Sequence, residues 1–446
     1  MRMTIPGPTY KEMLHPTQRP RPRSELDPAN LFAISWRNPG EPVRHVVIPK
    51  QLTGVAANII VLVGRCFPSG SHKVGPAYAT LMEGELAGEI EPGRNTVIGP
   101  STGNFGIGTA YIAKLKGYPA IVIMPEGMSR ERYERIRQYG GQLDLTPGSE
   151  SDVVLVLDRT EQYKREEQNK VLAQFELLPN YRFHRYVTGR SAIEAAALHG
   201  NRRIAAFVSA PGSAGTLAAG DEIKAEFPES VVCALEPKEC STLFNNGRGT
   251  HRIEGIGDKM VTLIHNILTT DFVQLIHDDD CVMGLELLQH NGRLLEQFTG
   301  AKEDSLANLR ELFGVSGICN LLGAIRLARH LDLGADDNVV TIATDGFDRY
   351  PSVLVDLERR VGPIDDPMRA GWFESILRDA QRPEILDVRS REEKERLFEC
   401  KERFWTGFGY SRPYLDKMKS QGFWEAECEQ VEEIDCQLLR KRSFDG

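Results

Sequence analysis

One lysine of this chain stands where its amine could act as a nucleophile. Lys73 lies in the turn PSGSHKVGPAY, which follows the apolar run NIIVLV and precedes a segment with helical spacing. An amine at the positive end of a helix, partly shielded from water, has a lowered pKa because both effects disfavour the ammonium form. The neutral amine can attack an aldehyde and form a Schiff base. An ordinary solvated lysine in a turn fits this run as well, so Lys73 alone does not decide.

A second polar turn, PSTGNFGIG at residues 100–108, separates a strand-like run from a helical one. Ser101, Thr102 and Asn104 offer short polar side chains. The glycines, Gly103 among them, let backbone amides approach a bound anion closely. The turn therefore predicts a carboxylate site, although serine, threonine and asparagine also cap helices for purely structural reasons.

A third turn, SAPGSAGTLAAG, occupies residues 209–220. Its backbone amides are suited to a phosphate at the start of the next helix, and the residues that would hold it are Gly212, Ser213, Ala214, Gly215 and Thr216. The competing interpretation is a dinucleotide site, since the turn approaches GxGxxG and Glu236 follows about 20 residues later. Ala210 replaces the first glycine of that pattern, so the sequence favours a bare phosphate.

The elements around these turns indicate an α/β protein. From residue 45 to about 362, short β-branched runs alternate with segments of helical spacing, which predicts parallel sheets with flanking helices. The clearest strands are TVIGP, AIVIMP and QLDLTP. The helix between the last two should be capped by Ser129 and stopped by Gly140. This arrangement places the turn at 100–108 at the carboxyl end of a sheet, where open α/β folds bind ligands.

The two ends of the chain differ from this middle part. Residues 1–44 are rich in Pro and Arg, and we expect an arm that wraps another part of the protein or stays mobile. After Pro363 the sequence is charged and favours helices, and its tryptophans predict packing on the core or on a partner subunit. The expected parts are an arm (1–44), a core (45–362) with a smaller lobe at about 95–200, and a helical C-terminal extension (363–446).

Composition restricts the classes of partner. Hydrophobic residues make up 41% and charged residues 26% of the chain, as in soluble globular proteins. The net charge of -9 opposes binding to phosphate backbones, so nucleic acid is not an expected partner. The eight cysteines form no CxxC pair, and neither a metal site nor a disulfide is expected. No run reaches the roughly 18 apolar residues of a membrane span, and no signal peptide is recognisable, so we expect no membrane partner and a cytoplasmic location.

Taken in order, the three turns resemble the motifs of pyridoxal-phosphate (PLP) enzymes of fold type II, the tryptophan-synthase-β fold. GSHK (70–73) resembles the Schiff-base motif, STGN (101–104) the asparagine loop, and GSAGT (212–216) the phosphate loop. The resemblance covers about residues 45–352. It implies two lobes with open parallel sheets and flanking helices, followed here by the C-terminal helical extension.

Further similarities favour the branch of cysteine synthase and cystathionine β-synthase. AQFELLPNYRFHRYVTG is similar to the segment whose glutamine, here Gln174, helps to bind substrate, and HRIEGIGDK (251–259) is similar to another run of this branch. Ser316 stands where the branch places a serine opposite the pyridine nitrogen, and TDGFDRY (344–350) resembles the run that follows it. A serine need not protonate the ring, which suits β-elimination better than transamination.

The resemblance implies roles for individual residues. Lys73 would carry pyridoxal 5'-phosphate as a Schiff base and serve as acid and base, and Asn104 would contact the 3′ oxygen of the cofactor. The substrate carboxylate would be held by the other members of the asparagine loop, Ser101, Thr102 and Gly103. His72, before the lysine, fits a phosphate contact and a packed turn histidine equally well. Val74 and Gly75 replace the Asp-Arg that often follows the lysine, which leaves the orientation of the substrate open.

The implied activity is that of a lyase or transferase, cysteine-synthase-like, acting on a small-molecule L-amino acid with a leaving group on Cβ. Loss of that group would give an aminoacrylate, to which a nucleophile adds. The alternatives are a serine/threonine dehydratase or ammonia-lyase, and a non-catalytic protein of the same fold that serves as a sensor or assembly partner. A homodimer is expected from the resemblance.

Overall fold

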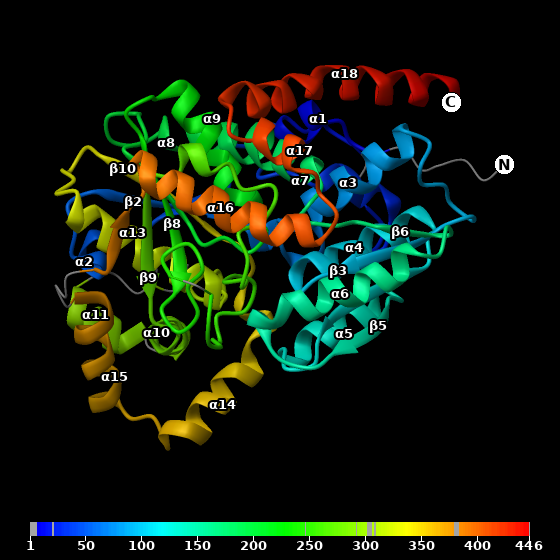
Figure 1. The fold of residues 1–446 in the computed structure, drawn as a ribbon. Coiled ribbons are helices and arrows are strands. Elements are labelled where there is room, and N and C mark those ends of the chain that lie inside the picture. The colour runs from blue at the N-terminus through cyan, green and yellow to red at the C-terminus, as the bar shows by residue number, and fades with distance from the viewer. Residues whose placement is uncertain are drawn as a thin grey trace.

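The protein is built on two sheets of mainly parallel strands covered by helices (Figure 1). The computed structural model describes residues 7–19, 22–245, 247–290, 292–300, 306, 309–378 and 383–445. In this part of the chain the larger sheet has the strand order β1-β2-β10-β7-β8-β9-β11, and the smaller sheet has the order β5-β4-β3-β6. This confirms the predicted α/β class with parallel sheets, flanking helices and a helical extension.

The inner strands of the larger sheet are buried on both faces. Its strands are β1 (His45–Val47), β2 (Asn58–Val63), β10 (Asn338–Ala343), β7 (Ala206–Ser209), β8 (Val231–Pro237), β9 (Phe272–Ile276) and β11 (Ile385–Asp387). The outer strands β1 and β11 pair antiparallel and the others pair parallel. Along β10, Val340 and Ile342 join one hydrophobic core while Val339 and Ala343 join the other. Burial on both sides explains the unbroken apolar runs in the sequence.

The smaller sheet is entirely parallel and consists of β3 (Thr96–Pro100), β4 (Ala120–Pro125), β5 (Gln142–Thr146) and β6 (Asn169–Val171). Its flanking helices are α4 (Asn104–Lys116), α5 (Arg130–Gln138) and α6 (Val153–Lys164). Helix α5 ends just before Gly140, which has a positive φ of 79°, as predicted. Ser129 stands at the predicted N-cap position, but its hydroxyl does not cap the helix and donates to Glu254 at 2.9 Å. A carboxylate distant in the sequence thus replaces the expected contact with the helix backbone.

The remaining helices cover the sheets and connect them. They are α1 (Tyr10–Leu14), α2 (Lys50–Thr53), α3 (Val74–Leu86), α7 (Leu178–Phe183), α8 (Arg190–Ala196), α9 (Ala218–Glu226), α10 (Asp278–His290), α11 (Gly292–Thr299), α13 (Val315–His330) and α14 (Pro351–Val361). No helix in the described ranges is long and apolar enough to cross a membrane.

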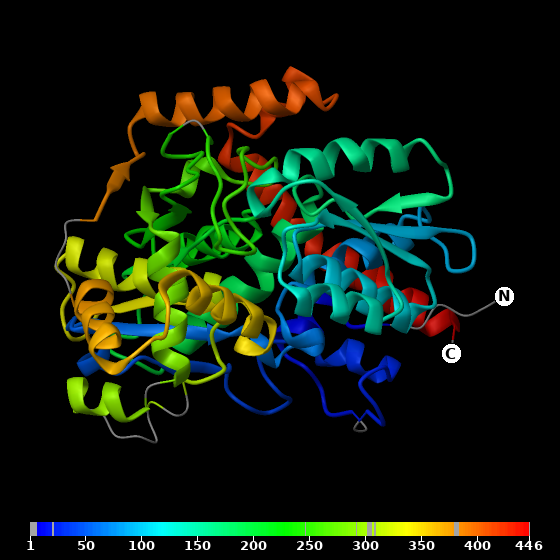
Figure 2. The ribbon, with the colours of Figure 1, turned by 90° about the horizontal axis from the view of Figure 1, so that it is seen from below.

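The C-terminal extension contains the helices α15 (Asp366–Trp372), α16 (Arg391–Gly407), α17 (Arg412–Lys417) and α18 (Gln421–Asp445). It packs on the core of its own chain and also supplies β11, the edge strand that pairs with β9. In α16, the buried Trp405 donates its indole N–H to the carbonyl of Val261 at 2.8 Å. Helix α18 runs beside α1, so the two termini lie on the same side of the molecule (Figures 1 and 2). There the carboxylate of Asp435 accepts the backbone N–H groups of Tyr10 and Lys11 at 2.7 and 3.0 Å.

Candidate active site

Lys73 lies directly before α3, in a turn that begins at the end of β2. The side chain is buried, with 9% of the residue exposed, and its Nζ lies 3.5 Å from the Ser213 hydroxyl. Burial lowers the pKa of Lys73 to about 8, against the opposing effect of the carboxylates of Asp258 and Glu150. The neutral amine is therefore more highly populated near neutral pH than it is in a solvated lysine, and formation of a Schiff base requires this neutral form.

The turn at 100–108 is held in shape by its own side chains. The Ser101 hydroxyl accepts the backbone N–H groups of Gly103 and Gly106, both at 2.9 Å. Gly103 has a φ of 157°, and a Cβ on it would lie 2.5 Å from Cδ of the buried Arg132. Only glycine allows the loop to lie this close to Arg132, and the loop in turn places Asn104 at the start of α4.

The amide of Asn104 is held at both ends by a buried polar network. Its Nδ2 donates to Asp345 at 2.6 Å, and its Oδ1 accepts from Arg349. The same carboxylate oxygen of Asp345 accepts the Tyr350 hydroxyl at 2.8 Å and lies 3.9 Å from Arg132. The run TDGFDRY, through Asp345, Arg349 and Tyr350, thus fixes the plane of the Asn104 amide. One hydrogen on Nδ2 remains available to a ligand.

The turn between β7 and α9 is tightly fitted to the helix beside it. Ala214 adopts the left-handed conformation with a φ of 64°, and a Cβ on Gly215 would lie 2.2 Å from Asn180 Oδ1. Asn180 Nδ2 donates to the Ser213 hydroxyl at 2.9 Å, while the hydroxyl of Thr216 accepts from that of Ser209 at 2.8 Å. The loop therefore keeps a fixed shape, with glycine where its backbone lies closest to the neighbouring helix.

Buried polar atoms beside this loop have no partner within the described protein. They include Asn180 Oδ1 and Nε2 of His184, whose ring carbon Cδ2 would lie 2.8 Å from a Cβ on Gly215. Both ring nitrogens of His72 are unpartnered as well. A buried polar group without a partner is costly, so such a cluster fits a site that receives a polar group from a ligand.

Most of the predicted site residues line one small cavity. The predicted residues around it are Lys73, Ser101, Thr102, Asn104, Gln174, Gly212 and Ser213. Gln174 donates to the carbonyl of Pro100 at 3.1 Å, which holds its amide against the asparagine loop. Gly103, Ala214, Gly215, Thr216 and Ser316 do not line this cavity. Ser316 is buried near the start of α13, and its hydroxyl has no partner among the described residues.

Two carboxyl groups in the cavity were missed by sequence reasoning. Glu150 and Asp258 are both buried in its wall, and each has one oxygen without a hydrogen-bond partner in the described protein. Burial raises the pKa of Asp258 to about 7, although Lys73 lowers it. Burial also raises the pKa of Glu150 well above its ordinary value, and Asp258 raises it further against the effect of Arg132. Such perturbed acids in a cleft are typical of functional sites.

The sequence did carry signals for both acids. Glu150 follows the carboxyl end of β5, the edge at which ligands bind in such sheets. Asp258 lies in the run HRIEGIGDK, which is similar to a run of the cysteine-synthase branch.

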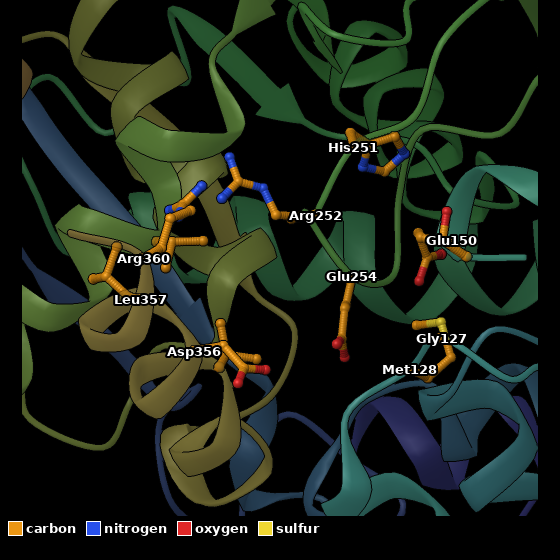
Figure 3. Close-up of a pocket in the computed structure, with 12 residues that line it drawn as sticks. Gly127, Met128, Glu150, His251, Arg252, Glu254, Asp356, Leu357 and Arg360 are labelled. Atoms are coloured by element: carbon orange, nitrogen blue, oxygen red, sulfur yellow. The ribbon is translucent and has the colours of Figure 1, made fainter. Parts of the chain in front are cut away.

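A larger cavity of about 250 Å³ lies beside this site and shares Glu150 with it. Figure 3 shows Arg252 and Arg360 on one side of this space, His251 and Met128 on the other, and Glu150 facing it. The wider cavity therefore borders the site at Glu150. No cluster suited to a metal ion occurs among the described residues.

The structure leaves the dinucleotide interpretation without its acidic residue. Glu236 at the end of β8 is buried, and its carboxylate accepts the backbone N–H groups of Thr242, Leu243 and Phe244 at 2.8–3.0 Å. A carboxylate bound in this way does not reach a ribose hydroxyl. Its role is to hold the turn after β8.

Comparisons with known proteins agree on one family. A family model described as pyridoxal-phosphate dependent enzyme matches residues 51–314, more than half of the chain. A cysteine synthase of Staphylococcus aureus is 32% identical over 324 residues, covering 72% of this chain and 95% of the relative. The crystal structure of a hydrogen sulfide-producing enzyme from Fusobacterium nucleatum matches with a TM-score of 0.59 and 25% identity over 69% of this chain and 96% of the other. An O-acetyl serine sulfhydrylase of Entamoeba histolytica shares the fold, with a TM-score of 0.63 and 24% identity over 81% and 98% of the two chains.

Proposed function

Because the chain belongs to the family of pyridoxal-phosphate dependent enzymes, we propose that it catalyses β-replacement on a β-substituted L-amino acid, as a cysteine synthase does. The observation that carries the proposal is the buried Lys73 amine, with its lowered pKa, in a cavity walled by the asparagine loop and the phosphate loop. The cofactor, when bound, supplies an electron sink for the carbanion at Cα.

The residues around the cavity divide among cofactor and substrate. The unpartnered polar atoms beside Gly215 suit the phosphate, which the loop Gly212–Ser213–Ala214–Gly215–Thr216 would hold. Asn104, fixed by Asp345 and Arg349, would donate to the 3′ oxygen, and the free hydroxyl of Ser316 would face the ring nitrogen. The substrate carboxylate would bind at Ser101, Thr102, Gly103 and Gln174.

Lys73 has a second role as the group that moves the Cα proton. With its nitrogen free, the lowered pKa of Lys73 would let the neutral amine accept that proton near neutral pH. Burial excludes bulk water, so the proton stays on the amine and does not exchange freely with solvent. The same ammonium can return it to Cα when the new β-substituent is in place.

Asp258 is suited to handle the proton of the incoming nucleophile. Its pKa of about 7 lies near the working pH, and its free oxygen is buried in the wall of the cavity that holds Lys73. A general base is most effective when its pKa is close to the ambient pH. We therefore assign Asp258 the role of base toward the nucleophile.

This assignment predicts a change in pH dependence for Asp258→Asn. In the unmodified enzyme kcat should rise as pH increases through about 7, because the Asp258 carboxyl loses its proton there. The asparagine cannot accept a proton, so kcat should fall roughly a hundred-fold and the rise near pH 7 should disappear. The measurement is the steady-state rate of cysteine formation from pH 5.5 to 9. An unchanged acid limb in the variant would remove Asp258 from this role.

The activity itself is tested by supplying O-acetylserine together with sulfide. We expect cysteine to form in amounts equal to the acetate released, because the reacting groups are buried and water is less able to compete with the added nucleophile. Cysteine and pyruvate are measured in the same reaction. Accumulation of pyruvate without cysteine would identify a dehydratase or ammonia-lyase, and release of neither product with any β-substituted amino acid would identify a non-catalytic protein.

Two further proposals concern the state of the protein in the cell. A homodimer is inferred from relatives of this fold type, and size-exclusion chromatography with light scattering tests it. A cytoplasmic location is inferred from the cysteine pattern, because thiols without disulfide frameworks are typical of a reducing compartment.

A further inference from the structure

One helical segment lies between the proposed phosphate loop and both ends of the chain. This segment, residues 178–189, is called the anchor helix; it comprises α7 and a π-helical turn at His184–Gly189. Its inner face carries Asn180, bonded to Ser213, and His184, whose ring lies against Gly215. Near its other side, a Cβ on Gly75 would meet the ring of Phe183, so the anchor helix also lies close to the start of α3 after Lys73.

The N-terminal arm reaches the anchor helix through Trp36. This fully buried side chain donates its indole N–H to the Thr188 hydroxyl at 3.0 Å, and the same hydroxyl lies 3.0 Å from His184 Nδ1. If Thr188 accepts from Trp36 and donates to Nδ1, His184 must carry its hydrogen on Nε2, the atom without a partner. The Trp36 ring also stacks on His72, with centroids 5.6 Å apart and planes inclined by 26°.

Helix α18 holds the outer face of the same anchor helix. Arg185 donates to the backbone carbonyl of Trp424 at 2.7 Å. Arg182 forms ion pairs with Glu427 of α18 and with Glu83 of α3, and its Nε donates to Glu83 at 3.0 Å. The side chains of these ion pairs are largely buried, and such pairs fix geometry strongly because breaking one leaves an unpaired charge.

We propose that the two terminal segments position the phosphate end of the cofactor site: Trp36 through Thr188 and His184, and α18 through Glu427 and Arg182. Trp36, Thr188 and Glu427 are then positioning residues, since they act on the phosphate loop through the anchor helix. The inference rests on the proposed cofactor site. It gives the arm and the extension, which lie outside the matched family region at 51–314, a function in cofactor binding.

The test compares the affinity of the cofactor-free protein for pyridoxal 5′-phosphate with its affinity for pyridoxal, which lacks the phosphate. Thr188→Val removes the hydroxyl but keeps the shape of the side chain, so the preference for the phosphorylated form should fall roughly tenfold, the effect of about one lost hydrogen bond. Trp36→Phe should act in the same direction. Thr188→Ser keeps the hydroxyl and should restore the preference of the unmodified protein. General destabilisation would weaken both ligands alike and leave the ratio unchanged.

The chain offers matched controls for both changes. Thr270 bonds Nε2 of the buried His265 at 2.8 Å, outside the cavity, so Thr270→Val removes a comparable histidine–threonine contact. Tyr111→Phe removes a buried side-chain donor to the carbonyl of Glu25, and so breaks a hydrogen bond between the arm and the core away from the anchor helix. Neither control should change the preference for phosphate. Loss of preference in these variants equal to that in Thr188→Val, or no loss in Thr188→Val, would overturn the arm's role.

The role of α18 is tested separately with Glu427→Gln, which weakens the ion pair with Arg182. The preference for the phosphorylated ligand should fall about threefold, because weakening the ion pair removes part of the binding free energy of about one hydrogen bond. The control is Glu286→Gln, which weakens the buried pair with Arg369 away from the site. Equal ratios in the two variants would overturn the role of α18. These preferences are ratios of binding constants, so they can be measured whichever reaction the protein catalyses. Absence of cysteine formation would contradict only the proposed activity.

Discussion

Replacing Lys73 with alanine is expected to abolish cysteine formation, lowering kcat by about 10⁴-fold or more. The variant loses both the nitrogen that would hold the cofactor and the base that moves the Cα proton, and groups that act in this way carry most of the rate. The residual rate is measured at saturating cofactor. In the unmodified protein, borohydride reduction followed by peptide mass analysis should place the cofactor on the peptide containing Lys73.

Lys401 provides a stringent control for this experiment. It is a second buried lysine, and burial lowers its pKa to about 7, even below that of Lys73. Its ammonium donates to the carbonyls of Leu263 and His265, and it does not line the cavity. Lys401→Met should therefore leave kcat within about twofold of the unmodified enzyme at temperatures where the variant is folded. Cofactor trapped on Lys401 would show that burial alone, and not position in the cavity, selects the lysine.

Asp345→Ala is expected to lower the free energy of unfolding by roughly 3–5 kcal/mol, the largest loss of stability among the variants proposed for this protein. The carboxylate of Asp345 is fully buried and accepts from Asn104 and Tyr350, and it lies 3.9 Å from both Arg132 and Arg349. Alanine would remove a negative charge near the buried guanidinium groups of Arg132 and Arg349. It would also leave two hydrogen-bond donors without their acceptor. Denaturant unfolding of the cofactor-free protein measures this directly.

Two further variants test whether the loss of stability at Asp345 arises from its buried charge and hydrogen bonds. Asp345→Asn keeps an acceptor oxygen but removes the charge, so its cost should lie between those of the unmodified protein and the alanine variant. Asp387→Ala removes an exposed carboxylate paired with Arg389 and should change stability by less than about 1 kcal/mol. An alanine variant of Asp345 as stable as that of Asp387 would contradict the network's contribution.

Local pattern was sufficient to predict the elements that present the site. Apolar runs buried on both faces indicated parallel strands, and the glycine after α5 indicated where that helix ends, because these depend on neighbouring residues. The turns with Lys73, Asn104 and Ser213 could be predicted for the same reason, because the residues of each motif lie within a few positions of one another. Ser129 misled the prediction since a distant carboxylate, Glu254, competes for its hydroxyl.

Other parts of the site depend on contacts that local pattern does not contain. Asp258 and Glu150 meet Lys73 only after the two lobes fold together, and their raised pKa values arise from burial that no spacing reports. The sequence predicts that residues 1–44 form an arm that wraps another part of the protein or stays mobile. What it wraps was unknown, because Trp36 and Thr188 are 152 positions apart in the chain.

The bond between Tyr10 and Asp435 has a consequence for the order of events during synthesis. The ribosome releases the N-terminal arm first, but the carboxylate that accepts its backbone N–H groups emerges 425 residues later. At about 5–20 residues per second, the arm waits tens of seconds for this partner. The smaller sheet, whose last strand ends at Val171, can therefore form early in synthesis. The larger sheet needs β10 and β11, and the contact between the arm and Asp435 forms only after α18 has been made.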